Sequence, residues 1–227
     1  MSDDARCLID RLQSLGIKNP IILDIGANRG QFAKSVISLD PTCRIFAFEP
    51  GATARREFDA SLLSNPAIEL IPIGLSDVSG TSTLWYDEPG SELASLTRRN
   101  LDHRNVTFGQ FEDIQLSTVD NWCKLRNLTP DAMKIDTEGH ELRVLSGARQ
   151  TLKHIKVLQF EFGGTSIDTR NFFKDYFEFF NEHGFVLYRK TPAGLLKAQN
   201  YDEGLERFTY SNWIAVRTEI PHCQSIP

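Results

Sequence analysis

Short apolar segments alternate with stretches of helical periodicity along most of the chain. The run from Ile21 to Leu23, for example, leads into a glycine-containing turn and then into apolar residues at helical spacing over 31–39. Continuous apolar runs bounded by turn residues are typical of strands buried on both faces. The strands expected on this basis cover residues 21–23, 44–48, 68–75, 132–135, 155–162, 185–189 and 213–217. We therefore predict an α/β fold with a mainly parallel sheet and helices on both of its faces.

The segment 78–131 follows this pattern less well. Residues 81–86 alternate like a half-buried strand, and 106–116 is an ambiguous second strand. Ser117 and Asp120 fit a capping box at the start of a helix. We expect this segment to be an insertion between the two halves of the sheet.

Aromatic and arginine residues gather in three places. The aromatic stripe over 172–180 has helical spacing and is expected to face the core, as are Trp122 and Trp213. Three arginines lie in the insertion: Arg98, Arg99 and Arg104. A solvated face is the simpler interpretation of these three arginines, and the alternative is that they hold an anionic group of the substrate or cover a cofactor.

Composition and charge narrow the class of protein. The 227 residues are 41% hydrophobic and 24% charged, which is ordinary for a globular domain. The net charge is −5, so nucleic acid is not an expected partner. Cys7, Cys43, Cys123 and Cys223 form no CxxC pair, which favours reduced thiols. With no apolar run of the ~18–20 residues that a membrane span needs, and no apolar leader, we expect a cytoplasmic protein.

Acidic residues follow the first three predicted strands. In such sheets ligands bind beyond the carboxyl ends of the strands. Asp24 begins a turn that contains Gly26 and Gly30, and this turn departs from the GxGxxG dinucleotide pattern. An acid there favours an ammonium-bearing ligand, Glu49 could accept from a ribose diol, and Ser76-Asp77 could accept from an adenine amino group. Each is also compatible with an ordinary turn, but together they predict one cleft for a nucleoside with a cationic tail.

The same residues resemble the FkbM family of S-adenosylmethionine-dependent methyltransferases. The resemblance spans about 20–165 and is most specific from Lys134 through Ala148. It implies a seven-stranded class I methyltransferase fold, Rossmann-like, with the last strand antiparallel. It also implies S-adenosylmethionine as cofactor and a hydroxyl as methyl acceptor, often on a sugar. The cofactor-binding residues that it implies are Asp24, Gly26, Asn28 and Gly30 around the methionine part, Glu49 at the ribose, and Ser76 with Asp77 near adenine. Ser95-Leu96 resembles a segment near the cofactor.

The turn after the fourth strand supplies the candidate catalytic residues Asp136, Glu138 and His140. A hydroxyl must lose its proton when it is methylated, so a general base is expected. His140, with an ordinary pKa near ~6.5, is the first candidate; Glu138 and Glu161 are rivals, and positioning without a base is a further alternative. Asp136 is more easily interpreted as positioning cofactor or substrate. The three residues of the turn could also ligate a divalent cation, but their spacing matches no metal signature and we expect no metal.

The sequence therefore predicts one methyltransferase domain. Its parts are an N-terminal helix over 1–19, a cofactor-binding half over 20–77, the insertion 78–131, a catalytic and substrate half over 132–217, and a tail over 218–227. The insertion and the segment 163–210 are expected to shape a pocket for a small-molecule or carbohydrate acceptor. The alternatives are methylation of nitrogen or RNA, and a cofactor-binding module without activity.

Overall fold

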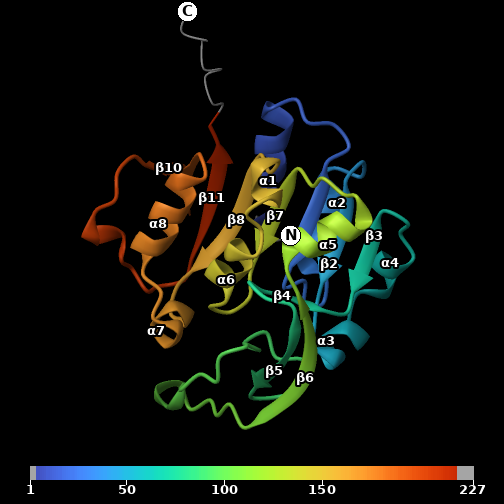
Figure 1. Cartoon of the computed structure of the whole chain (residues 1–227), viewed down its shortest axis with the longest axis vertical. Helices are drawn as coiled ribbons and strands as arrows, with labels where there is room; N and C mark the ends of the chain where they lie inside the picture. The colour runs from blue at the N-terminus through green and yellow to red at the C-terminus, as the bar shows by residue number, and fades with distance from the viewer. Residues whose placement is uncertain (1–3, 219–227) are drawn as a thin grey trace, which may run out of the picture.

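The computed structural model describes residues 4–218, in which two β-sheets are joined by helices (Figure 1). Cys223 and the predicted tail from residue 219 onward lie outside the described residues. The strands are β1 Ile21–Ile25, β2 Arg44–Phe48, β3 Ile68–Ile71, β4 Gly74–Leu75, β5 Gly80–Tyr86, β6 Gln110–Ser117, β7 Ala132–Ile135, β8 Val157–Phe162, β9 Phe185–Thr191, β10 Gly194–Ala198 and β11 Ser211–Arg217. The α-helices are α1 Asp4–Ser14, α2 Gln31–Leu39, α3 Ala52–Arg56, α4 Ala60–Leu63, α5 Val119–Arg126, α6 Glu141–Ser146, α7 Thr165–Thr169 and α8 Phe173–Glu182.

The main sheet confirms the predicted α/β architecture. Its order is β3-β2-β1-β7-β8-β11-β9-β10, with β1, β2, β3, β7 and β8 parallel. The last strand, β11, runs antiparallel between β8 and β9, as the resemblance implied. The predicted count of seven strands is wrong by one, because the short, mostly exposed β10 turns back along β9 and adds an eighth strand at the edge.

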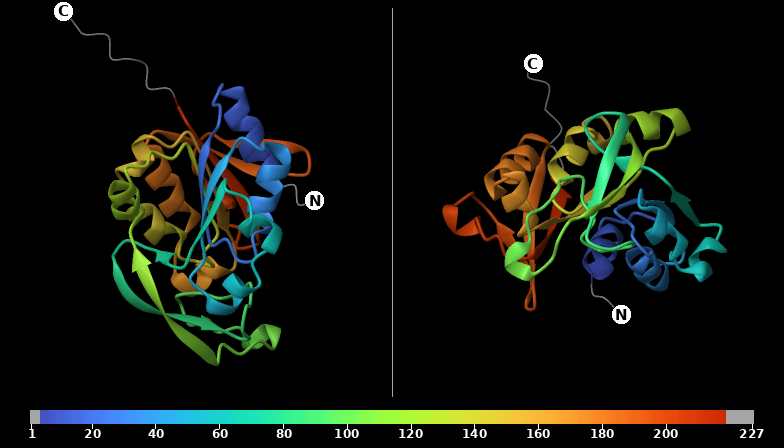
Figure 2. Two further views of the ribbon diagram at one scale, coloured as in Figure 1. Left: turned by 90° about the vertical axis from the view of Figure 1, so that its right-hand side faces the viewer. Right: turned by 90° about the horizontal axis from the view of Figure 1, so that it is seen from below.

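Helices cover both faces of this sheet, as expected (Figure 2). On one face α5, α6 and α8 pack against side chains such as Leu23, Met133 and Phe160. On the other face α1, α2 and α4 pack against the alternate side chains of the same strands, such as Ile22 and Ala132. The two faces are therefore separate apolar layers, and the functional residues are left to the edge where the strands end.

The small sheet, of order β4-β6-β5, corrects two details of the prediction. The expected strand 68–75 is interrupted after Ile71, so that β3 belongs to the main sheet and β4 to the small one. Ser117 ends β6 rather than capping α5; Thr118 is the cap, and its side chain accepts from the Asn121 amide. The Asp120 carboxylate instead accepts hydrogen bonds from the backbone amides of Gln150 and Thr151. Both corrections arise from long-range pairing that the local sequence pattern does not contain.

The aromatic core is as predicted except at Phe172, the first residue of the stripe, which is 54% exposed because it precedes α8. Phe173, Tyr176 and Phe180 of the stripe are fully buried in α8. Trp213 packs on Phe173, with ring centroids 4.2 Å apart, and Trp122 is likewise buried in the core. Of the helices in the described part of the chain, none combines the length and the apolar character needed to cross a membrane.

Candidate active site

A cavity of about 370 Å³ lies at the carboxyl ends of β1, β2, β7 and β8. The small sheet closes it from below in the view of Figure 1, through side chains of β5 and β6. The connecting arm that contains Ser95 and Leu96 supplies a further wall, and Tyr210 and Asn212 border it on the side of β11. The predicted insertion therefore does form part of the cavity wall.

The glycine turn after β1 lines the cavity with Gly26, Ala27 and Asn28. Gly26, Asn28 and Gly30 all have positive φ angles, of 77°, 47° and 86°. A Cβ on Gly26 would lie 1.8 Å from the carbonyl oxygen of Asp136, and one on Gly30 would meet Phe58 and Leu62. The glycines are therefore needed for the turn and for its packing on the protein itself, rather than for a close approach to a ligand.

Asp24 lies beneath this turn and is not among the residues that line the cavity. It is fully buried, and its carboxylate is 3.4 Å from the ammonium of Lys134. Lys134 also contacts Asp136 at 3.3 Å and donates to the Gly26 carbonyl at 2.7 Å. Burial raises the pKa of Asp24, against the opposing charge of Lys134. Lys134 thus ties β1, the glycine turn and the end of β7 together.

Glu49 faces the cavity from the end of β2. Its two carboxylate oxygens accept from the backbone amides of Asn28 at 2.9 Å and Gly51 at 2.7 Å. Burial raises the pKa of Glu49, and these two hydrogen bonds oppose the rise. Each oxygen keeps a second lone pair, so the carboxylate can accept from a ligand without giving up a protein contact.

Ser76 and Asp77 lie outside the cavity lining, next to His140, which does line it. The Ser76 hydroxyl donates to Asp77 at 2.8 Å and lies 2.9 Å from Nε2 of His140. Asp77 also pairs with Arg143 at 3.1 Å. Of the three acids expected to surround one cleft, only Glu49 lines it, because Lys134 holds Asp24 underneath and Arg143 holds Asp77 on the outer side.

Arg99 crosses from the insertion to the main sheet, which corrects its interpretation as part of a solvated face. Only 4% of its side chain is exposed. Its guanidinium contacts Glu138 and Asp168, each at 2.9 Å. Arg98 has a different role, because its guanidinium lies over the ring of Trp85 in the small sheet. Arg99 therefore holds the arm of the insertion against the candidate catalytic turn.

Three carboxylates crowd the ends of β7 and β8. Asp136, Glu138 and Glu161 each offer an oxygen, and these oxygens lie within 4.8 Å of one another. Burial and then the charge of Asp136 raise the pKa of Glu138 to about 7. Burial and the neighbouring carboxylates raise the pKa of Glu161 to about 10, so Glu161 keeps its proton at neutral pH.

The turn that carries Asp136 and Glu138 is held by Glu141, a residue that the sequence did not single out. Its buried carboxylate accepts from the amides of Thr137 at 2.9 Å and Gly139 at 3.1 Å. Glu138, between them, has a φ of 53°, a left-handed conformation that is uncommon without glycine. Glu141 therefore offsets the cost of this backbone, as a carboxylate in the first turn of a helix can do for the amides that precede it.

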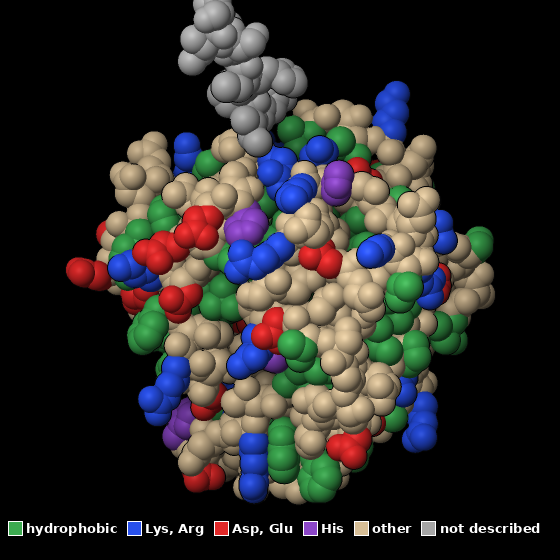
Figure 3. All heavy atoms as spheres, viewed as in Figure 1, with side chains coloured by type: hydrophobic (Ala, Val, Ile, Leu, Met, Phe, Trp, Pro, Cys, Tyr) green, Lys and Arg blue, Asp and Glu red, His purple; other side chains and the backbone are tan. Residues whose placement is uncertain are grey.

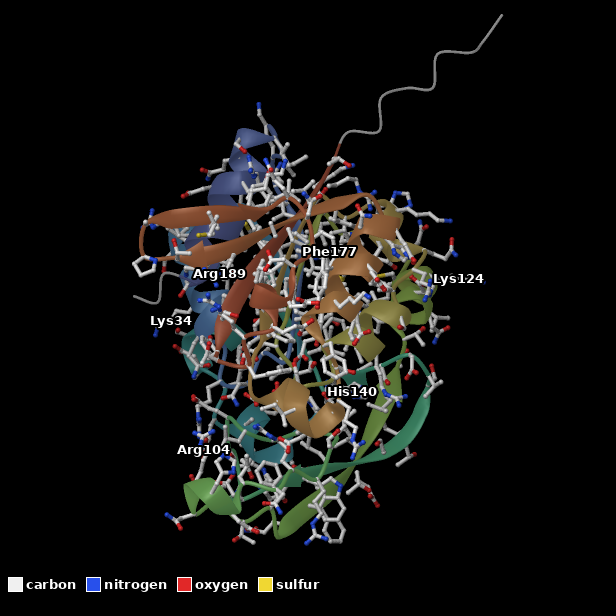
Figure 4. The ribbon with its side chains drawn as sticks, turned by 90° about the vertical axis from the view of Figure 1, so that its left-hand side faces the viewer. Lys34, Arg104, Lys124, His140, Phe177 and Arg189 are labelled. Atoms are coloured by element: carbon white, nitrogen blue, oxygen red, sulfur yellow. The ribbon has the colours of Figure 1, made fainter. Side chains whose placement is uncertain are left out.

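The structure thus brings Gly26, Asn28, Glu49, Asp136, Glu138 and His140 to one cavity, together with Glu161. The ion pairs and hydrogen bonds by which Lys134, Arg99 and Glu141 hold the site together were not predicted. Lys134 had a detectable signal, since a lysine two residues before Asp136 in an otherwise apolar strand shares its face with that acid. The partners of Arg99 lie 39 and 69 residues away, and nothing local indicates them. His140 lies at the level where the main sheet meets the small sheet (Figure 4).

The outer surface has no single sign of charge on the face seen in Figure 3, where lysine and arginine side chains are scattered among acidic ones. The cavity differs from this surface. Six acidic residues line it, and Lys134 is the one lysine or arginine among its described lining residues. A cationic ligand is thus favoured inside.

Comparison with known proteins identifies a protein family whose sequence model matches most of this chain. The sequence model of the methyltransferase FkbM domain matches residues 24–187, well over half of the chain. The matched region contains the glycine turn, Glu49, the insertion and the turn from Asp136 to His140.

Two curated relatives are methyltransferases by name. The 2-O-methyltransferase NoeI of Sinorhizobium fredii is 26% identical over 154 residues, which cover 63% of this chain and 63% of NoeI. The methyltransferase sdnD of Sordaria araneosa is 28% identical over 158 residues, covering 57% of this chain and 60% of sdnD. The chain thus aligns with less than two thirds of either relative. Among solved structures, a precorrin-6y C5,15-methyltransferase from Geobacter metallireducens has a TM-score of 0.47 at 15% identity, with 92% and 87% of the two chains covered.

Proposed function

Because the chain belongs to the FkbM methyltransferase family, we propose that it is a methyltransferase that transfers a methyl group from S-adenosylmethionine to a hydroxyl of a small-molecule or carbohydrate acceptor. The observation that carries this proposal is the lining of the cavity. It combines a strand-end glutamate, a left-handed glycine turn and a cluster of carboxylates beside a neutral histidine.

The lining residues fit the cofactor. Glu49 has a lone pair free on each oxygen for the two hydroxyls of a ribose. The apolar side chains of Phe48, Leu75 and Leu84 offer a wall against which the adenine ring could pack. Gly26 and Asn28 lie at the end of β1, where the methionine part would lie, and the acidic lining favours its cationic sulfur. When bound, S-adenosylmethionine supplies an electrophilic methyl group.

The chain's own residues have two tasks around that methyl group. The first is to hold the acceptor oxygen in line with it, which lowers the entropic barrier. Tyr86 and Ser95 from the insertion, with Tyr210 and Asn212 from the segment before and within β11, border the space left for an acceptor. We therefore propose that the insertion and the segment 163–210 shape the acceptor site.

The second task is to take the proton of the hydroxyl. His140 lines the cavity, and burial followed by the charge of Arg143 lowers its pKa to about 4. It is therefore neutral, with a lone pair available, at physiological pH. A pKa of 4 makes it a weak base, but an oxygen that is gaining a methyl group becomes strongly acidic, so a weak base suffices. Glu138 is engaged by Arg99 and Glu161 is protonated, so both are poorer candidates.

The experiment has a binding arm and a turnover arm. Calorimetry with S-adenosylhomocysteine should show one site per chain. Turnover over a panel of sugars, glycosylated metabolites, amines and RNA should release S-adenosylhomocysteine only with hydroxyl acceptors. His140→Ala should lower kcat by at least about a hundredfold and change the affinity for S-adenosylhomocysteine by less than about twofold. Absence of binding would contradict the cofactor, binding without turnover on the whole panel would favour a silent module, and an unchanged kcat would remove His140 as the base.

A further inference from the structure

We propose that Ser76 and Asp77 are positioning residues that hold His140 in the tautomer with its proton on Nε2, so that Nδ1 is the atom that accepts the proton of the methyl acceptor. This inference rests on the proposed function and deepens it. It assigns a different role to two residues that the resemblance implied to lie near adenine.

The geometry is a chain of hydrogen bonds that leads out of the cavity. His140 lines the cavity, while Ser76 and Asp77 do not. Nε2 of His140 lies 2.9 Å from the Ser76 hydroxyl, which lies 2.8 Å from Oδ1 of Asp77. Ser76 is 2% exposed, so water does not compete for its hydroxyl. Asp77 is fixed in turn by Arg143, on its second oxygen, at 3.1 Å.

The direction of these hydrogen bonds follows from Asp77. Burial would raise the pKa of Asp77, but the hydrogen bond from Ser76 and the charge of Arg143 outweigh it and lower the pKa. The carboxylate is therefore ionised and can only accept, so the single proton of the Ser76 hydroxyl points to Asp77. The hydroxyl oxygen then has only lone pairs to offer His140, and Nε2 must carry a proton that it donates.

The neutral ring has one proton, so a proton on Nε2 leaves Nδ1 with a lone pair. Among the residues that the structure describes, no group hydrogen-bonds Nδ1 of His140. When the acceptor hydroxyl is methylated, its O–H bond breaks and a new N–H bond forms at Nδ1. The resulting imidazolium keeps its Nε2 proton on Ser76, and the negative charge of Asp77 stabilises it across that hydroxyl. No proton reaches Asp77.

The other charged groups around His140 fall into two sets: a cation that destabilises the imidazolium, and carboxylates that line the cavity. Arg143, from α6, disfavours the imidazolium. Asp136, Glu138 and Glu161 line the same cavity as the ring. Asp77 is the acid that hydrogen bonds connect to the ring, through the Ser76 hydroxyl. The connection gives Asp77 an effect on both the orientation and the charge of the ring.

The first measurement is the tautomer of His140 in the full chain without ligand. Long-range proton–nitrogen correlation spectra of ¹⁵N-labelled protein at pH 7 distinguish the two tautomers, and a His140→Gln sample assigns the signal. The wild type should show the Nε2–H form. Ser76→Ala should lose that preference. Asp77→Asn should reverse it, because an amide donor makes the Ser76 hydroxyl donate to Nε2 instead. Arg143→Met removes only the outer charge and should keep the Nε2–H form.

The second measurement separates positioning from cofactor binding. Ser76→Ala and Asp77→Asn should each lower kcat at least about tenfold, while the affinity for S-adenosylhomocysteine changes by less than about twofold. An Nδ1–H tautomer in the wild type, or an unchanged tautomer in both variants, would overturn the inference. So would a loss of S-adenosylhomocysteine affinity with normal kcat, which would return both residues to an adenine site. The spectra need no acceptor, so they remain decisive even if the proposed reaction fails.

Discussion

The carboxylates at the ends of β1 and β2 are held apart by their protein partners, whereas those at the ends of β7 and β8 crowd one another even though Asp136 and Glu138 each have a cationic partner. Glu49 accepts two backbone amides, and Asp24 is paired with Lys134. Across the cavity the carboxylate oxygens of Asp136, Glu138 and Glu161 lie within 4.8 Å of one another, and Glu161 must keep a proton.

The difference matches two kinds of task. A binding surface gains from groups whose geometry is already fixed, because the ligand then has no reorganisation to drive. A reaction centre gains from groups held in unfavourable surroundings, because perturbed protonation states are the basis of acid–base chemistry. We infer that the β1–β2 side is built to bind and the β7–β8 side to react. Lys134 is the residue that connects the two sides.

Lys134→Met should have the largest effect, on stability. It leaves the carboxylate of Asp24 fully buried without its ion pair and should lower the free energy of unfolding by about 3–5 kcal/mol. Removing the pair raises the folded-state pKa of Asp24 further above its unfolded value. The folded state then binds the proton of Asp24 more tightly than the unfolded state, so the stability of the protein falls as pH rises. Urea unfolding should therefore show a larger loss at pH 8 than at pH 5.

Two control variants test this explanation. Lys124 is exposed on α5, and Lys124→Met should change stability by less than about 0.5 kcal/mol. Adding Asp24→Asn to Lys134→Met removes the stranded charge and should recover part of the loss. A loss below about 1 kcal/mol in Lys134→Met would mean that the buried pair does not connect the two sides.

Glu49→Gln should have the next largest effect, on binding. The amide retains one acceptor oxygen but loses the charge and the second acceptor. The free energy of binding S-adenosylhomocysteine, measured by calorimetry, should therefore become less favourable by about 1–3 kcal/mol. Glu69 provides the matched control, because it lies outside the cavity in β3 and pairs with Arg126 at 2.7 Å. Glu69→Gln should bind like the wild type. Equal affinities in the two variants would show that the β1–β2 side is not the binding side.

Glu161→Gln should increase stability, since it removes part of the crowding on the reactive side. The folded-state pKa of Glu161 is raised from 4.5 to about 10. Its contribution to stability is therefore fully present below pH 4.5 and is lost as pH rises toward 10. At pH 8 the variant should be more stable by at least ~1.4 kcal/mol, the equivalent of one pKa unit, and the gain should shrink at pH 5.

The control for this change is Glu178→Gln, whose side chain is 60% exposed on α8. It should unfold with the wild type at both pH values. If Glu161→Gln proved less stable than the wild type at pH 8, the carboxyl group would be well accommodated and the contrast between the two sides would be lost.

The sequence predicted the main sheet well, because short-range signals were sufficient there, but of the three acids expected around one cleft only Glu49 lines the cavity. The apolar runs ending in Asp24, Glu49 and Asp136 set the strand ends, and parallel strands bring such ends to one edge. It failed where pairing is long-range. The small sheet, the ion pairs of Arg99 and the role of Lys134 beside Asp24 depend on residues many positions apart, and a charge pattern cannot tell an exposed arginine from a buried one.

The smallest effect should come from a chelator. Oxygens of Asp136, Glu138 and Glu161 lie close enough to ligate a divalent cation. However, Lys134 is 3.3 Å from Asp136, Arg99 is 2.9 Å from Glu138, and Glu161 keeps its proton, so a cation would have to displace two positive groups and a proton. We therefore expect kcat in EDTA to stay within about twofold of its value without EDTA, and added Mg²⁺ to leave the unfolding temperature unchanged. Abolition of turnover by EDTA with recovery in Mg²⁺ would instead identify the crowded carboxylates as a metal centre. Their proximity would then serve to bind a cation rather than to perturb their protonation states for proton transfer.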